Sequence, residues 1–96
     1  MAQPGRTAIA LPAVIDLDAL DAIRDGLSDA LEVGGVRLDA SGVERVATNG
    51  LFLLLSAAET ARRHRFDFAI TEPSAPLLAA IERLGLGSPF EGLIRA

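Results

Sequence analysis

Residues 36–63 hold the pattern that most limits how this chain can fold. The segment starts with the run VRLD at 36–39, typical of a buried strand, turns through ASG at 40–42, and makes a second apolar step at 43–46. The sequence LFLLLSAAETARR at 51–63 is too long and too rich in Leu and Ala for a strand, so it predicts a helix. The rest of the chain is arranged around this strand–turn–helix unit.

The helix start, ATNG at 47–50, is the most informative part of the sequence. Thr48 is placed to be the N-cap, with its hydroxyl accepting a backbone N–H from residue 50 or 51, an interaction worth about 1 kcal/mol. The same hydroxyl lies beside the unpaired N–H groups and the positive end of the helix dipole, where a phosphoryl group would find donors. Thr48 therefore has two interpretations, a plain helix cap or a functional hydroxyl.

The helical wheel predicts which side chains of this helix face solvent. Phe52 points with Ser56, Glu59 and Arg63 away from the core face, about one turn beyond Thr48, so an exposed aromatic and a hydroxyl would form one surface. The alternative is that Phe52 packs under a loop or a neighbouring helix. The expected core face consists of Leu51, Leu54, Leu55, Ala58 and Ala61.

Composition excludes several classes of protein. The 96 residues fit one domain, 1–96, and no cysteine is present for a disulfide or a thiolate metal site. The net charge of −4 argues against nucleic acid as the main partner. The lone His64 sits among arginines at a helix end, which makes a metal role improbable. With no signal peptide and no run near the roughly 20 apolar residues of a membrane span, we expect a cytoplasmic protein without a cofactor.

Before the central unit, the sequence predicts two short strands and a helix. Residues 7–11 read as a strand that stops at Pro12, and residues 13–15 as a brief edge strand, which together suggest a hairpin or bent ribbon. Asp16 or Asp18 then caps a helix over 18–32, which Gly34-Gly35 ends. Its polar face is either simply solvated or steers a partner rich in Arg or Lys. The acidic residues of that face are Asp18, Asp21, Asp25, Asp29 and Glu32.

After the central helix, residues 66–70 predict a strand beside 36–39. Ser74 is placed to cap a third helix over 75–84, which Gly85 closes. The tail holds scattered hydrophobic residues and a short final strand at 93–94. The apolar positions expected in the third helix are Leu77, Leu78, Ile81 and Leu84.

This order predicts an α/β fold, with a small mixed β-sheet of about four to five strands covered by three to four helices. Sites in such open sheets form in the loops at the carboxyl ends of the strands. Thr48 and Ser74, the two hydroxyls at helix starts, should therefore lie along the same edge.

No catalytic constellation is present in the sequence. It contains no phosphate-binding loop of the known types and no His pair or carboxylate cluster at metal-ligand spacing. The turn at Ser41 lacks a histidine to activate it, because His64 is at the opposite end of the central helix. Asp39 has no acidic neighbour with which to divide acid and base roles. These absences favour a binding module over an enzyme.

Taken together, the ordered motifs resemble the STAS domain family, which is shared by sulfate transporter tails and anti-sigma factor antagonists. The resemblance runs from about residue 9 to residue 90, through LP at 11–12, VRLDAS at 36–41, the apolar step at 43–46, TNGL at 48–51, PS at 73–74 and LGL at 84–86.

The resemblance implies a regulatory protein that docks an anti-sigma factor or a serine/threonine kinase-like ATPase and is switched by phosphorylation at the start of the second helix. The family pattern of Asp, Ser or Thr, a small residue and Gly falls on residues 47–50. Thr48 matches the phosphoacceptor, and the implied docking residues around it are Ala47, Asn49, Gly50, Phe52, Leu53 and Ser74.

Two departures from the family pattern bear on this function. Ala47 stands where the family usually has Asp, and Phe52 stands where antagonists commonly carry a small residue. The open alternatives are an accessory subunit of a lipid-transport ABC ATPase and a chemotaxis-associated STAS protein without a phospho-switch. In both, Thr48 would be a docking contact.

Overall fold

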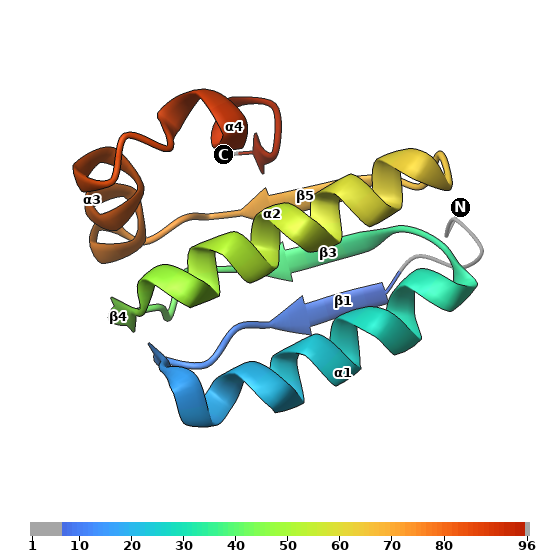
Figure 1. Cartoon of the computed structure of the whole chain (residues 1–96), viewed down its shortest axis with the longest axis horizontal. Helices are drawn as coiled ribbons and strands as arrows, with labels where there is room; N and C mark the ends of the chain where they lie inside the picture. The colour runs from blue at the N-terminus through green and yellow to red at the C-terminus, as the bar shows by residue number, and fades with distance from the viewer. Residues whose placement is uncertain (1–6, 96) are drawn as a thin grey trace.

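A four-stranded parallel sheet forms the centre of the computed structural model, which describes residues 7–95 (Figure 1). Its strands are β1 (Thr7–Ala10), β3 (Val36–Asp39), β5 (Phe68–Thr71) and β6 (Ile94–Arg95), in the spatial order β1-β3-β5-β6. Every strand pairing in this sheet is parallel. The predicted α/β class is therefore confirmed, as is the placement of the strand after the central helix beside residues 36–39, although that strand runs 68–71 and not 66–70.

The predicted N-terminal hairpin is wrong. β2 (Val14–Ile15) does not pair with β1; it forms a separate two-stranded parallel ribbon with β4 (Arg45–Val46). β1 ends at Ala10 and pairs along its whole length with β3, where Leu11 N–H still donates to the Asp39 carbonyl. Pro12 cannot donate to a sheet ladder, so the chain leaves the sheet there and reaches β4 instead. The sheet was predicted to be mixed, but every strand pairing in residues 7–95 is parallel.

Two long helices cover one face of the sheet (Figure 1). α1 (Leu17–Val33) has Asp16 as its N-cap, with the carboxylate accepting the Ala19 N–H at 3.0 Å. α2 (Thr48–Arg63) lies beside it and packs on β5. Helices were expected over 18–32 and from a start at 47–50 to residue 63, and the structure confirms both, with α1 longer by one residue at each end. The alternation in β3 fits this cover, since Val36 and Leu38 are buried while Arg37 and Asp39 are exposed.

The C-terminal part closes the core at the sheet edge. α3 (Ala75–Arg83) has Ser74 as N-cap, as expected, and Gly85 follows it with φ of 70°, a conformation that suits glycine. The tail was expected to be irregular before a strand at 93–94, but it forms the short helix α4 (Gly87–Glu91) before β6 at 94–95. Phe90 of α4 has no exposed surface, so the tail supplies a central core residue.

Four predicted core positions, two in each of two helices, need correction. In α2, Ala57 is buried in place of Leu55 and Ala58, which are only half-buried. In α3, Leu78 and Leu84 are exposed, and Ala80 is buried beside Leu77 and Ile81. In both helices the buried face therefore includes an alanine that the expected wheel left out, and it excludes larger residues that the wheel had placed in the core.

Candidate functional site

The carboxyl ends of the sheet strands and the starts of the long helices meet at one edge of the molecule. β1, β3 and β5 point their carboxyl ends to the side of Figure 1 where β4, the start of α2 and α3 lie. Thr48 and Ser74 both sit at this edge, each at or before the first residue of its helix. Thr48 and Ser74 therefore lie along the same edge, as the sequence predicted.

Thr48 does not cap α2, so the predicted cap is wrong. The N-cap position belongs to Ala47, whose extended backbone (φ −73°, ψ 153°) makes Thr48 the first helical residue. The Ala47 carbonyl accepts the Gly50 N–H at 2.8 Å, so the first turn closes without a side chain. Thr48 is exposed, and its hydroxyl has no hydrogen-bond partner within residues 7–95. The hydroxyl is thus available at the positive end of the helix dipole.

Gly50 lets the start of α2 approach the β2–β4 ribbon. A Cβ at this position would lie 2.7 Å from Cγ2 of Ile15 and 3.1 Å from Cγ2 of Val46, and both neighbours are stiff β-branched side chains. Gly50 is itself buried. Its role in this site is therefore to seat the helix that carries Thr48, and it offers no surface to a partner.

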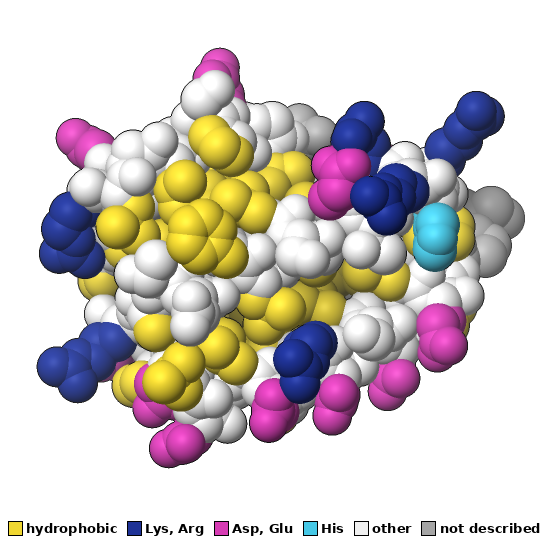
Figure 2. Space-filling view, viewed as in Figure 1, with side chains coloured by type: hydrophobic (Ala, Val, Ile, Leu, Met, Phe, Trp, Pro, Cys, Tyr) yellow, Lys and Arg dark blue, Asp and Glu magenta, His cyan; other side chains and the backbone are white. Residues whose placement is uncertain are grey.

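Phe52 is exposed, as predicted, with 51% of its surface accessible. Figure 2 shows hydrophobic side chains gathered over the first half of α2 and over the adjoining α3. Leu78 of α3 is 42% exposed. Leu78 was missed because it was counted as core; the i, i+3, i+4 spacing of the buried residues Leu77, Ala80 and Ile81 is the signal that would have excluded it.

The remaining predicted site residues differ in accessibility. Asn49 is exposed beside Thr48, Ala47 is half-buried, and Leu53 is half-buried. Ser74 is also half-buried, and its hydroxyl is already used: it donates to the Val43 carbonyl at 2.5 Å and accepts the Leu77 N–H at 3.2 Å. Of the hydroxyls of Thr48 and Ser74, only that of Thr48 makes no hydrogen bond within residues 7–95.

Asp39 ends β3 at the same edge and holds the turn that follows. Its carboxylate accepts the Ser41 N–H at 2.9 Å. This backbone hydrogen bond, together with one from the Ser41 side chain, lowers the pKa of Asp39 below its usual value, because both bonds favour the charged form. Asp39 therefore shapes the loop between β3 and β4 as a carboxylate, and it stays ionised near neutral pH.

Nothing in residues 7–95 resembles a metal centre or a membrane span. No group of three or more His, Asp or Glu side chains in that range is arranged to hold a metal ion. His64 is exposed at the far end of α2, with its ring edge-on to Phe66 at 5.8 Å between centroids. None of the described helices is long and apolar enough to cross a bilayer.

The family model described as "Mlab, STAS domain" matches residues 2–95, almost the whole chain. The chain belongs to the STAS domain family. No curated protein matches this STAS domain. Among solved structures it is similar to the anti-sigma factor antagonist SpoIIAA in its unphosphorylated form, with a TM-score of 0.78 at 18% identity over 99% of this chain and 82% of the other.

Two further solved structures share the fold. The Bacillus cell fate determinant SpoIIAA in its phosphorylated form has a TM-score of 0.74 at 18% identity, covering 99% of this STAS domain and 85% of that chain. A sulfate transporter family protein from Wolinella succinogenes has a TM-score of 0.68 at 16% identity, covering 94% and 75% of the respective chains. At these identities the likeness establishes the architecture, and the particular surface of this chain decides what it binds.

Proposed function

We propose that this STAS domain is a non-enzymatic regulatory module of the cytoplasm that docks a protein partner through the start of α2. The observation that carries the proposal is the exposed Thr48 hydroxyl, which has no partner within residues 7–95 and lies about one helical turn from the half-exposed Phe52. A polar group that the fold does not use, beside an exposed aromatic, is the usual composition of a protein contact surface.

The regulatory step in this proposal is phosphorylation of Thr48. Its hydroxyl oxygen would attack the γ-phosphorus of ATP bound by a kinase-like partner, releasing ADP and the hydroxyl proton. The product adds about −1.5 to −2 charges at neutral pH. The α2 dipole tolerates an anion there, while an apolar partner surface facing Phe52 would not. SpoIIAA, which has the same fold, has been solved in unphosphorylated and phosphorylated forms.

The expected partner of such a switch is an anti-sigma factor or a serine/threonine kinase-like ATPase. In this interpretation the exposed residues of the edge, Thr48, Asn49 and Phe52, make the contacts, and Leu53 borders them. Gly50 and Ser74 act from within, since the first seats α2 and the second caps α3. Ala47 supplies only a methyl group and the carbonyl that closes the first turn.

A second candidate function is a constitutive accessory subunit of a lipid-transport ABC ATPase. Ala47 favours it, because no carboxylate stands immediately before Thr48 to assist phosphoryl transfer. Phe52 also favours it, since a large exposed aromatic at the contact is typical of an interface hot spot that stays buried. In that function Thr48 is a contact without a switch, as it would also be in a chemotaxis-associated STAS protein.

The test is a matched affinity capture from the source cells, with wild type, Thr48→Glu and Ser88→Glu as baits. Ser88 is exposed in α4, so its variant controls for added charge away from the edge. For the switch, we expect wild type and Ser88→Glu to retain a kinase-like ATPase or anti-sigma factor and Thr48→Glu to lose it. Incubation of the captured complex with ATP should phosphorylate wild type, and Thr48→Ala should abolish this.

The outcomes separate the candidates. Capture of a transporter ATPase by wild type and Ser88→Glu, with no phosphate on Thr48 after incubation with ATP, would replace the switch by the constitutive subunit. Phosphate incorporation that survives Thr48→Ala would remove Thr48 as the sole acceptor. Capture by all three baits of a partner that cross-links away from α2 would reject this edge as the interface.

A further inference from the structure

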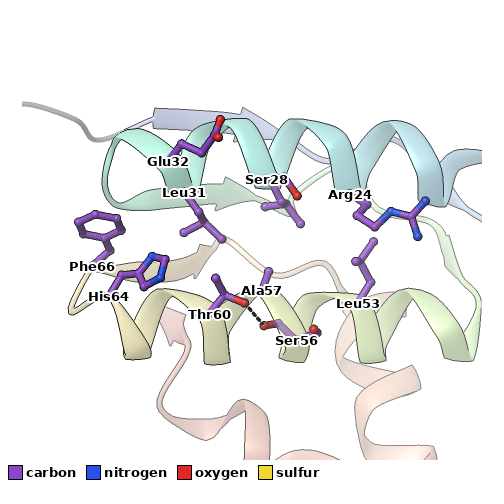
Figure 3. A pocket seen from close by; sticks show the side chains of 11 residues that line it. Arg24, Ser28, Leu31, Glu32, Leu53, Ser56, Ala57, Thr60, His64 and Phe66 are labelled. Carbon is purple, nitrogen blue, oxygen red and sulfur yellow. Dashed lines mark hydrogen bonds between the residues drawn. The ribbon is translucent and has the colours of Figure 1, made fainter.

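A groove of about 640 Å³ runs between α1 and α2, on the helical face of the molecule. Figure 3 shows its two walls: Arg24, Ser28, Leu31 and Glu32 project from α1, and side chains of α2 face them. The α2 wall extends from Leu53 to His64, which is about 16 Å of helix. The groove is therefore long and open, and its length matches a short segment of helix.

The floor of the groove is apolar and rigid. Leu27, Leu31 and Ala57 line it and are buried, so they are held by the core beneath them. Leu53 and Phe66 lie at its two ends and are half-buried. An apolar floor between two helices can accept the apolar side chains that a third helix presents at i, i+3, i+4 and i+7.

The two rims of the groove differ in charge. The α1 rim is acidic: Glu32 lines the groove, and Asp21 and Asp25 fall within about 20° of it on the helical wheel. Figure 2 shows a row of acidic side chains below the hydrophobic surface. Asp21 pairs with Arg24 at 2.6 Å, but Asp25, Asp29 and Glu32 have no ion-pair partner within residues 7–95. These carboxylates are free to pair with another molecule.

The α2 rim is neutral along most of its length. Ser56 is exposed with its hydroxyl unpaired within the described chain, and the Thr60 hydroxyl donates to the Ser56 carbonyl at 3.2 Å (Figure 3). Basic side chains appear only at the far end, from Arg62 to Arg65. One flank is therefore negative, the other offers hydroxyl groups, and the floor between them is apolar.

We propose that this groove binds an amphipathic helix of a partner protein, with its apolar stripe in the groove and Lys or Arg residues along one flank facing α1. Asp25 and Glu32 are seven residues apart, about two turns, on the same flank of α1, so basic residues at the same spacing on a helix lying alongside can meet them. About three turns of helix fill the length of the groove.

The charges argue against the other occupants. A second copy docked about a two-fold axis through this groove would bring its own acidic α1 face to it, and each copy has a net charge of −4, so the two copies repel each other. An anionic lipid headgroup or a nucleic acid would meet the same unpaired carboxylates. A basic amphipathic helix fits both parts of the groove, because its apolar side chains match the apolar floor and its Lys or Arg residues match the acidic α1 rim.

This groove is a different surface from the Thr48 edge. Thr48, Asn49 and Phe52 do not line it, although Leu53 at its mouth lies close to them in sequence. Binding in the groove therefore does not depend on the proposed switch, and a Thr48→Glu variant should bind the same helix as wild type.

The test uses a fluorescein-labelled peptide of about four turns, with Leu at i, i+3, i+4 and i+7 and Lys along one flank. A second peptide has Glu in place of each Lys. Fluorescence anisotropy measures the affinity of each for wild type, Ser56→Trp, Glu32→Lys and two controls, Ser88→Trp and Glu82→Lys. Ser56 and Ser88 are both exposed, as are Glu32 and Glu82, but only the first of each pair lines the groove.

We expect the Lys peptide to bind wild type and both controls alike, and the Glu peptide to bind at least about tenfold more weakly. Ser56→Trp should fill the groove and cost at least about tenfold in affinity. Glu32→Lys should weaken binding and make it less sensitive to salt, because one attractive charge has become repulsive.

Several results would overturn the proposal. The first is that the Lys peptide fails to bind wild type, and the second is that the Lys and Glu peptides bind it equally. The third is that Ser56→Trp binds the Lys peptide as tightly as wild type does. A dimer in sedimentation that Ser56→Trp abolishes would make the groove a self-association surface instead. Displacement of the peptide by vesicles of phosphatidylglycerol from wild type, but not from Ser56→Trp, would make it a lipid site.

Discussion

Of the two hydroxyl residues at helix starts, Ser74 forms hydrogen bonds within the fold and Thr48 forms none within residues 7–95. Ser74 caps α3 and also donates to the Val43 carbonyl, which ties the α3 start to the loop before β4. Thr48 has neither kind of bond, because Ala47 occupies the N-cap of α2. A side chain that the fold uses is costly to modify, whereas one that it does not use can be modified or contacted freely. The difference identifies Thr48 as the residue of this edge that is suited to regulation.

The two residues should therefore respond differently to the same truncation. We expect Ser74→Ala to lower the free energy of unfolding by about 1–2 kcal/mol, since it loses a cap and leaves the Val43 carbonyl without its donor. Thr48→Ala should change it by no more than about 0.5 kcal/mol, as is usual for an exposed side chain without such contacts. Urea denaturation measures both. Equal losses in the two variants would mean that Thr48 has a structural role after all.

At the scale of elements, the position of Thr48 depends on how α2 is seated on the β2–β4 ribbon. Ala47 N–H donates to the Ile15 carbonyl at 2.7 Å, and Gly50 lies against the Ile15 and Val46 side chains. The ribbon contains only two residues in each strand. Although the ribbon is small, it orients the first turn of α2, because Gly50 leaves no space between the helix and the side chains of Ile15 and Val46.

We expect Gly50→Ala to destabilise the domain by about 1–3 kcal/mol, because the added methyl must displace Ile15 or Val46. Gly26→Ala in α1 is the matched control, since a Cβ there meets nothing within 4 Å. In a helix interior that change should stabilise by about 0.5–1 kcal/mol. Thermal unfolding of the two variants tests the difference in sign. A stabilised Gly50→Ala protein would show that the ribbon does not restrain the helix.

At the scale of the whole molecule, the sequence predicted what local periodicity encodes. The three longer helices, Asp16 as one of two candidate caps of α1, the Ser74 cap and the exposure of Phe52 all follow from residues close in the chain. The parallel β2–β4 pairing joins segments about 30 residues apart, and no turn motif marks it. Its two-residue strands are also too short to show a period.

The site was predicted less completely than the fold, because it too depends on contacts between segments that are distant in the chain. Whether Ala47 or Thr48 is the N-cap depends on the backbone angles of one residue, and those are decided by the ribbon that α2 contacts. The groove between α1 and α2 depends on the spacing of two helices. Its acidic rim was visible in the sequence, but the apolar floor beside it was not. The sequence did not predict α4, because Gly87, Pro89 and Gly92 are typical of a loop, although Phe90 within it is completely buried.

Phe90 also bears on whether the chain unfolds as one unit. Because its ring is completely buried, Phe90→Ala should cost about 3–5 kcal/mol, a large part of the roughly 5–15 kcal/mol available to a domain of this size. We expect one urea transition at a much lower midpoint with an unchanged slope, while Ser88→Ala on the same helix leaves the midpoint in place. If instead only the amides of α4 and β6 lost hydrogen-exchange protection, the tail would be an independently unfolding segment and the STAS core would end at α3.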